Sequence, residues 1–217
     1  MMNGKIIWGV AAALYALFLA WHENWRGALT DAEIDTYMAR LATDDSISDE
    51  QRGAVKVFME NDTGREFFMV NLMAFTDGMV THPNTGAQIA PRALLQEYFR
   101  PFIGKMFIRA SYPAYTGPVV GGYLDAWEAE ADPGWSGAGL IRYRSRRDML
   151  EGVTDPSFSA GHVYKQLALR VTYAVPSEHR AGVLLSPRSW LALLLIALAA
   201  LAHVALLTVR KGKSTHA

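Results

Sequence analysis

The sequence predicts an α+β domain carried between two apolar, membrane-spanning segments, and two observations support this prediction. Residues 6–21 and 190–209 contain no charged side chain, whereas all 21 acidic residues of the chain lie between them. Within that middle part, runs of β-forming residues and amphipathic helical stretches follow one another in the order strand, helix, strand, strand, helix, strand.

The two apolar segments differ in length. Residues 190–209 are long enough to cross a bilayer, since a helix needs roughly 20 apolar residues to span the hydrocarbon core. Residues 6–21 form a shorter segment, which we expect to span the bilayer with aromatic residues such as Trp8 in the interfacial regions at its ends. A cleaved signal peptide is the alternative, because Lys5 precedes the apolar run. Phe18 stands where the cleavage motif requires a small residue, which favours an uncleaved anchor.

The basic residues that flank the spans predict the orientation. Lys5 precedes the first span, and Arg210, Lys211 and Lys213 follow the second, so the positive-inside rule places both termini in the cytoplasm. A long central domain crosses the membrane largely regardless of its charge, so residues 22–188 are expected outside the cytoplasm. We therefore expect two spans in a bacterial inner membrane, with the central domain in the periplasm.

The composition excludes several classes of function. Of the 21 Lys and Arg residues, four lie in the flanks just described, which leaves 17 against 21 acidic residues and a net charge of about −4 for the central domain. This balance offers no basic face for nucleic acid. The absence of cysteine excludes thiolate metal sites, iron–sulfur clusters and thiol nucleophiles. Because the standard enzyme motifs are absent as well, the residues establish no reaction.

Two helices are expected between the first anchor and the α+β domain. Thr30 with Glu33, and Ser48 with Gln51, have the spacing of capping boxes, and each pair precedes apolar residues at helical spacing. The chain thus divides into four segments, which are an N-terminal anchor (1–25), a helical neck (26–64), an α+β domain (65–185) and a C-terminal membrane helix with a basic tail (186–217).

The α+β domain is predicted to begin with a central strand at Phe67–Phe75, a run rich in β-forming residues and Met. Both faces of this strand are largely apolar, as expected if each is covered. After a polar loop, Pro91 starts a helix over 91–110, in which Pro101 predicts a kink or break. The apolar stripe of this helix consists of Leu94, Leu95, Tyr98, Phe102 and Met106.

The remaining predicted elements are strands at 118–129 and 137–145, a helical segment at 147–169 that is interrupted near Asp155, and a final strand at 170–175. The order βαββαβ is the signature of the ferredoxin-like fold, a four-stranded antiparallel sheet with two helices on one face. We therefore expect an α+β, ferredoxin-like domain with a helical neck and one transmembrane helix at each end.

Four stretches carry a resemblance to a known superfamily: VNLMAF in the first strand, GGYLDAW at the second, LIRYRSRRDMLEGVTDPSF across the third strand and second helix, and RVTYAV at the end. Over roughly residues 65–176 the chain resembles the dimeric α+β-barrel superfamily, and within it a small family of uncharacterised function related to antibiotic-biosynthesis monooxygenases. The resemblance implies a homodimer in which two sheets close an eight-stranded barrel. A membrane anchor, the neck or another protein could cover that sheet face instead.

The resemblance also implies a site. Haem-degrading monooxygenases of this superfamily use an Asn on the first strand and, as iron ligand, a His late in the second helix. Asn71 and His162 match these positions, and Phe158 matches their Phe-x-x-x-His spacing. A neutral imidazole is a normal iron ligand, so haem is the cofactor that the resemblance allows. However, Glu151 and Gly152 stand where those enzymes place a Trp. The alternative is a His satisfied by backbone or water.

Two further groups of residues are candidates for ligand binding. Arg142 and Arg144 share one strand face, where a guanidinium group can bind a carboxylate or a phenolate. Pairing with Asp125, Glu128 or Asp148 is the alternative. A cleft between the sheet and the helices would be lined by Met69, Met73, Phe75, Tyr98, Phe102 and Trp127. Such a Met and aromatic stripe is also typical of plain core. No metal site is expected.

His203 lies within the second apolar segment, among alanines. An ionisable group in hydrocarbon is costly, and small neighbours allow close contact between helices. We therefore expect His203 to make a polar contact with the other membrane helix. Cofactor ligation, or a reach toward the lipid headgroups near Thr208, is the alternative.

Two functions remain open from the sequence. In the first, a membrane-anchored extracytoplasmic domain acts as a non-catalytic accessory or interaction subunit, either as a homodimer or within a membrane complex. In the alternative, the protein is a haem-handling or cofactor-light monooxygenase that acts on a small hydrophobic substrate from the bilayer. The missing Trp favours the first function. Convergence of Asn71 and His162 on an open pocket would favour the second.

Overall fold

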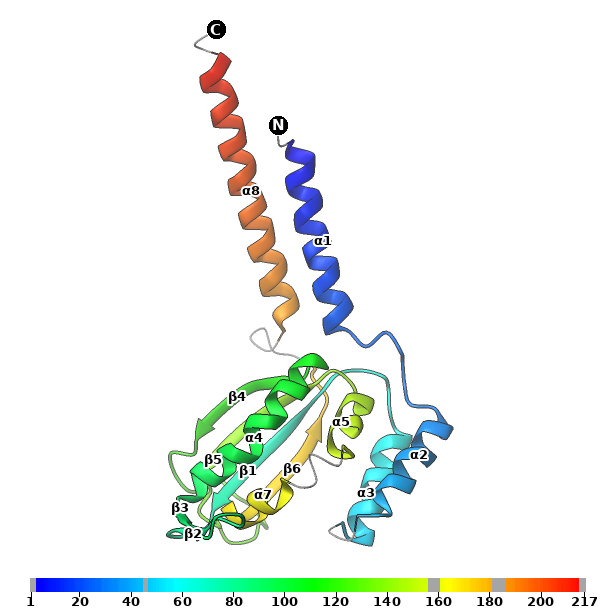
Figure 1. Ribbon diagram of the computed structural model, residues 1–217, viewed down its shortest axis with the longest axis vertical. Helices are drawn as coiled ribbons and strands as arrows, with labels where there is room; N and C mark the ends of the chain where they lie inside the picture. Colours follow the sequence, from blue (N-terminus) through cyan, green and yellow to red (C-terminus); the bar gives the residue numbers. More distant parts are fainter. Residues whose placement is uncertain (1–2, 45–46, 156–160, 181–185, 215–217) are drawn as a thin grey trace. The chain divides into compact units, whose positions relative to one another are not determined.

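The computed structural model describes residues 3–44, 47–155, 161–180 and 186–214 (Figure 1). The chain divides into two compact units. One unit combines both ends of the chain, up to Glu23 and from Arg180 onward, and the other is Asn24–His179. We call them the terminal unit and the α+β unit.

The terminal unit contains two apolar helices, α1 (Gly4–His22) and α8 (Pro187–Ser214). A stretch of 18 residues within α1 has a mean hydropathy of 1.6, and a stretch of 18 residues within Pro187–Val209 of α8 has a mean hydropathy of 2.6. Little of either stretch is buried, 11% and 6% respectively, so neither resembles the core helix of a soluble protein. Both helices are therefore long and apolar enough to span a membrane, as the sequence predicts.

The helices α1 and α8 pack against each other in antiparallel directions. At one end, the Nε and Nη2 atoms of Arg188 donate hydrogen bonds of 2.5 and 2.9 Å to the carboxylate of Glu23. Toward the other end, the Nε1 of Trp8 donates 3.3 Å to the Nδ1 of His203. A Cβ atom on Gly4 would lie only 2.6 Å from the Nε2 of His203. His203 is thus hydrogen-bonded to a residue of α1, and the missing side chain of Gly4 allows the close approach.

The α+β unit is built on a four-stranded sheet, β1 (Phe67–Phe75), β4 (Tyr112–Pro118), β5 (Gly137–Tyr143) and β6 (Leu169–Ser177). The strand order is β4-β5-β1-β6, and every neighbouring pair is antiparallel. In the central register, Val70 lies opposite Leu140 on one side and Val175 on the other. The strand β1 occupies the residues predicted for it, at the centre of the sheet.

Three helices lie on one face of this sheet: α4 (Pro91–Ile108), α5 (Arg146–Val153) and α7 (His162–Ala168) (Figure 1). The predicted stripe of α4 is buried, and the helix continues through Pro101, so the predicted break is wrong. A small hairpin, β2 (Val80–Thr81) and β3 (Gln88–Ile89), lies in the predicted polar loop. The predicted interruption near Asp155 separates α5 from α7, and Pro156 lies outside the described residues.

Two helices precede the sheet, α2 (Asp31–Leu41) and α3 (Asp49–Glu60). Both begin with the predicted capping boxes, at Thr30 and Ser48. In each box the side chain of the first residue accepts a hydrogen bond from the backbone N–H three residues later, and the side chain of that later residue accepts one from the backbone N–H of the first. Their apolar residues join the core of the α+β unit, in one cluster with residues of β1, α4 and α5. The neck helices are therefore part of the packing that surrounds the sheet.

The second strand lies earlier in the chain than the sequence predicts. A strand was expected at 118–129, but β4 ends at Pro118 and residues 119–136 form a loop without strands or helices. Ala110, shortly after α4, adopts a left-handed φ of 50° and reverses the chain direction. The residues that follow it, Tyr112–Pro118, therefore pair with the edge of β5, and no free edge of β5 is left for residues 119–136. Trp127, expected to line the cleft, is consequently 85% exposed.

Buried arginines at the junction of β5 and α5, which we call the arginine corner, join the elements of the α+β unit. Arg142 is 1% exposed, and it donates 2.8 Å to a carboxylate oxygen of Glu66 and 2.5 Å to the carbonyl oxygen of Ala110. The side chain of Arg146 reaches three acceptors, the carbonyl oxygen of Phe58 and the carboxylates of Asp62 and Glu178. The corner thus contacts the starts of β1 and β4 and the ends of α3 and β6.

Arg147 completes the arginine corner by binding the segment that leads into α2. Its Nε and Nη2 atoms donate 2.8 and 2.9 Å to Glu33, and other hydrogen bonds of 3.1 and 2.9 Å reach the carbonyl oxygens of Gly27 and Ala28. Hydrogen bonds from Arg147, followed by those from Thr30, lower the pKa of Glu33 from 4.5 to about 2. The pair therefore stabilises the fold fully above pH 4.5, and this contribution is lost as the pH falls toward 2.

The other face of the sheet is largely apolar away from Arg142, and no helix of the described α+β unit lies over it (Figure 1). Its side chains alternate with those that face the helices, so β1 contributes Val70 and Leu72 and β5 contributes Leu140. The most exposed large side chains on this face are Tyr115 at 51%, Tyr173 at 48% and Val175 at 56%. We call this surface the open sheet face.

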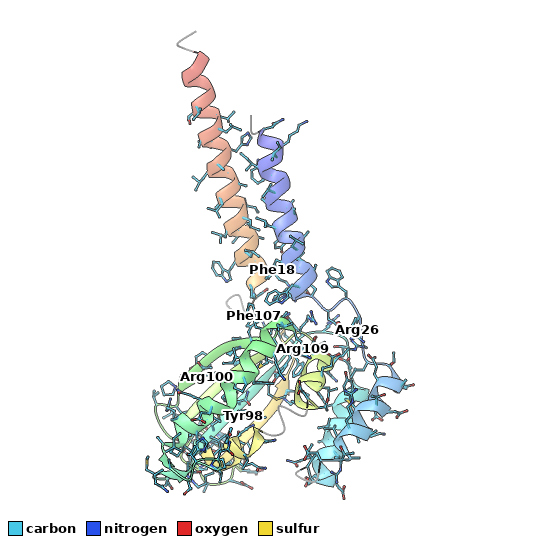
Figure 2. All side chains as sticks on the ribbon, in the orientation of Figure 1. Phe18, Arg26, Tyr98, Arg100, Phe107 and Arg109 are labelled. Atoms are coloured by element: carbon cyan, nitrogen blue, oxygen red, sulfur yellow. The ribbon has the colours of Figure 1, made fainter. Side chains whose placement is uncertain are left out.

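Replacement of Arg147 by Met is expected to destabilise the protein. The change removes the hydrogen bonds that Arg147 donates to the carbonyl oxygens of Gly27 and Ala28 and to the carboxylate of Glu33, at a cost of about 2–3 kcal/mol. The thermal unfolding midpoint of the full-length protein in mild detergent should fall by roughly 4–12 °C. Arg100→Met is the control, because Arg100 is exposed on α4 and its change should shift the midpoint little (Figure 2). Equal midpoints for the two variants would contradict the role of the arginine corner.

The pairing of α1 with α8 can be tested by cross-linking, since the chain contains no cysteine. A variant with Gly4→Cys and His203→Cys should be joined by a short bis-maleimide in membranes, so that the two helices stay together on a gel after cleavage between them. The control combines Gly4→Cys with Leu193→Cys, which lies ten residues or about 15 Å along α8. Equal cross-linking of both pairs would contradict the observed register.

Candidate functional site

An apolar cavity of about 200 Å³ lies between the sheet and the helices of the α+β unit. Much of its wall is hydrophobic and includes Met69, Phe99, Phe102, Ile141, Met149 and Val153. Leu41 and Ile47, from the end of α2 and the segment before α3, complete the wall. The helices that precede the sheet are therefore needed to close this cavity.

Asn71 and His162, which the resemblance pairs, both line this cavity, together with Met69 and Tyr98. The amide Nδ2 of Asn71 donates 2.9 Å to the carbonyl oxygen of Met69, which orients the amide on β1. The ring of His162 lies 6.3 Å from the ring of Tyr98, centre to centre. With Phe102, five of the residues expected at a site thus line one space. Phe158, the first residue of the expected spacing, lies outside the described residues.

The protonation of the polar side chains follows from their burial. Burial lowers the pKa of His162, the positive charge of Lys165 lowers it further, and Asp44 acts in the opposite direction. The imidazole is therefore neutral at neutral pH and can accept a proton or a hydrogen bond. Burial raises the pKa of Tyr98, a residue of α4 that is labelled in Figure 2, and its phenol therefore stays protonated. The cavity thus presents neutral hydrogen-bonding groups among apolar walls.

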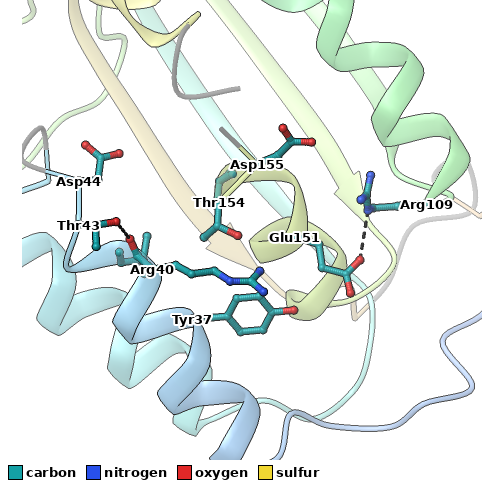
Figure 3. Close-up of a pocket in the computed structure, with 10 residues that line it drawn as sticks. Tyr37, Arg40, Thr43, Asp44, Arg109, Glu151, Thr154 and Asp155 are labelled. Carbon is teal, nitrogen blue, oxygen red and sulfur yellow. Dashed lines mark hydrogen bonds and ion pairs between the residues drawn. The ribbon is translucent and has the colours of Figure 1, made fainter. Parts of the chain in front are cut away.

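A larger, polar cleft of about 880 Å³ adjoins the cavity (Figure 3). It lies between the end of α2 and the end of α5, and its charged groups include Arg40, Asp44, Arg109, Glu151 and Asp155. The Nε of Arg109 pairs with Glu151 at 3.3 Å, so part of this charge is compensated within the cleft. Leu41, Asp44 and Val153 line both spaces. The polar cleft therefore lies beside the apolar cavity and offers it an approach from solvent.

The other expected ligand-binding residues lie elsewhere. Arg142 belongs to the arginine corner, on the opposite side of the sheet from the cavity. Arg144 forms a bidentate ion pair with Asp148, with N···O distances of 2.5 and 2.9 Å. Asp148 is one of the alternative partners expected for it. Met73 packs beside a second buried cluster, with Leu94 and Leu95, and does not line the cavity. These side chains therefore have structural contacts where ligand contacts were expected.

Lys165 is a cavity residue that the sequence analysis missed. It follows His162 by three positions in α7, a spacing that places two side chains on the same helix face. That spacing was the available signal, but a lysine on a helix is normally solvated. Burial lowers the pKa of Lys165, in keeping with its position at the cavity wall.

Haem does not fit this site, although His162 and Asn71 are in suitable places. The cavity measures about 200 Å³, whereas pockets for even drug-sized ligands measure roughly 300–1,000 Å³. We therefore derive no chemistry from haem for this protein.

The sequence matches no protein-family model and no curated protein. Two crystal structures of the RPA0582 protein, a protein of unknown function from Rhodopseudomonas palustris, are similar to it, and one is of the methylated form. Each is 15% identical, with TM-scores of 0.51 and 0.52. The similarity covers 62% and 63% of this chain and 95% and 94% of the other. At this identity, the likeness shows a shared α+β fold and nothing about function.

Proposed function

We propose that this protein is a membrane-anchored domain that binds a small hydrophobic molecule in the apolar cavity. The observation that carries the proposal is the convergence of Asn71, His162 and Tyr98 on one mostly apolar space. Ligand sites typically combine apolar walls with a few placed polar groups. An engineered apolar cavity of about 150 Å³ holds benzene, so this space suits a molecule of one or two rings.

We therefore favour binding of a small molecule over a purely structural role, and we do not include haem among the ligands. A neutral His162 beside the oriented amide of Asn71 could accept a proton from the bound molecule. This is the chemistry that a cofactor-light monooxygenase of the resembling family would need. Binding is the first requirement of that activity and is the part that the cavity supports.

The two apolar helices fit this role because a hydrophobic molecule concentrates in the bilayer. We propose that α1 and α8 span a bacterial inner membrane, with both termini in the cytoplasm and the α+β unit in the periplasm. The support is the length and hydropathy of both helices together with the basic residues outside them. The anchor would keep the binding domain beside the source of its ligand.

A second candidate function follows from the open sheet face. We propose that the α+β unit is ferredoxin-like, since its strand order and its two helical connections fit that topology, and that two copies pair through this face. The support is the group of exposed apolar side chains on it, with Tyr115, Tyr173 and Val175 about half exposed. In this form, the protein would act as a self-associating accessory subunit of a membrane complex.

Ligand binding can be measured with 5-fluoroindole and fluorine NMR on the full-length protein in detergent. Saturable binding is expected, and Ala174→Phe should weaken it at least tenfold because the ring fills the cavity from β6. Gln96→Phe, on the exposed side of α4, should bind like the unaltered protein and controls for partition into micelles. Binding that Ala174→Phe leaves unchanged, or no saturable binding at all, would rule out the proposal.

Self-association can be measured by light scattering in detergent. The unaltered protein should have twice the 24.0 kDa mass of one chain, and Val175→Asp should shift it to one copy by placing a charge on the open sheet face. Val163→Asp, at a partly exposed position on α7, should leave the mass unchanged. A single-copy mass for the unaltered protein would refute pairing through this face.

A further inference from the structure

Lys165 places a positive charge at the wall of the apolar cavity. It lines the cavity from α7, on the same helix face as His162. In the described part of the chain, no ion pair or hydrogen bond joins its Nζ atom to another group. The only carboxylate among the described lining residues is that of Asp44, whose charge acts on His162.

Unlike the half-buried Lys165, the buried arginines of the α+β unit have carboxylate partners. Three arginines with side chains at most 10% exposed each face a carboxylate, in the pairs Arg142 with Glu66, Arg146 with Asp62, and Arg147 with Glu33. Pairing offsets the loss of hydration that burial imposes on a charge. Among the residues that the structure describes, Lys165 has no such partner, and burial lowers its pKa.

A buried cation without a counter-ion costs stability, so it is typical of a binding site rather than of a core. An anionic group on the ligand would supply the missing charge. The pair would form beside apolar walls, where little water competes and the electrostatic attraction is stronger than at a surface. The cavity therefore suits a molecule with an apolar body and one negatively charged oxygen.

We propose that the ligand of the apolar cavity is a small organic acid, whose carboxylate or phenolate oxygen pairs with the Nζ of Lys165 while its hydrocarbon part lies against Phe102, Ile141 and Met149. This inference rests on the proposed small-molecule function and specifies its ligand class. The cavity of about 200 Å³ limits the apolar body to one or two rings. Two further polar residues line the same cavity, His162 on α7 beside Lys165 and Asn71 on the sheet.

The test compares two probes of the same shape, 4-fluorobenzoate and 4-fluorobenzamide, by fluorine NMR on the full-length protein in detergent at pH 7. The benzoate is ionised at this pH and the benzamide is neutral. We expect the benzoate to bind at least tenfold more tightly. Equal binding of the two probes would overturn the inference and leave the proposed function standing. Failure of both probes and of 5-fluoroindole to bind would overturn both.

Variants of Lys165 assign the preference to this side chain. Lys165→Met should bind the two probes alike, whereas Lys165→Arg, which keeps the charge, should retain a preference for the benzoate. Lys56→Met removes a charge of the same kind from an exposed position on α3 and should retain the full preference. A preference for benzoate that survives in Lys165→Met would overturn the assignment.

Stability gives a second readout that a structural lysine would not produce. If Lys165 serves binding, Lys165→Met removes an uncompensated buried charge, and the thermal midpoint of the ligand-free protein should stay equal or rise. Addition of 4-fluorobenzoate should raise the midpoint of the unaltered protein and leave that of Lys165→Met unchanged. A midpoint that falls in Lys165→Met, with no benzoate effect in the unaltered protein, would assign the lysine to the fold and overturn the proposal.

Discussion

The arginine corner is the interaction on which the rest of the α+β unit depends. Three guanidinium groups from one short stretch reach α2, α3 and the starts of β1 and β4, which are far apart in the sequence. A guanidinium group has five donors in a rigid plane, so it can bind a carboxylate and backbone carbonyls together. The desolvation of each charge is offset only when all of these acceptors are in place. The corner therefore fixes how the helices before the sheet pack against it.

The cavity is a consequence of that packing. Leu41 and Ile47 close it, and both belong to the segment around α2 that Arg147 holds through Glu33. The sheet supplies the opposite wall, where Asn71 is oriented by the Met69 carbonyl. The protein thus has polar side chains away from solvent in two different settings, the arginine corner and the cavity wall. In the corner each buried guanidinium faces a carboxylate, whereas the Nζ of Lys165 at the cavity wall faces none among the residues that the structure describes.

Much of the fold follows from local patterns. The capping boxes at Thr30 and Ser48, the strand Phe67–Phe75 and the apolar stripe of α4 all depend on neighbouring residues, and all lie where the sequence predicts. The second strand was misplaced because 118–129 is rich in β-forming residues, yet its position depends on which segment first reaches the edge of β5. The turn at Ala110 decides that, and a left-handed alanine carries no sequence signal. Trp127 was misassigned to the cleft for the same reason.

By itself, the sequence determined the two apolar helices and the α+β class, because hydropathy and periodicity are local properties of the chain, whereas the candidate pair Asn71 and His162 came from the resemblance to a known superfamily. The tertiary structure alone decided which polar residues share an environment. It placed Arg142 in an ion pair with Glu66 and Lys165 at a cavity wall, although both are basic residues on regular elements. Whether a charge is compensated depends on groups brought from distant parts of the chain, and only folding brings them together.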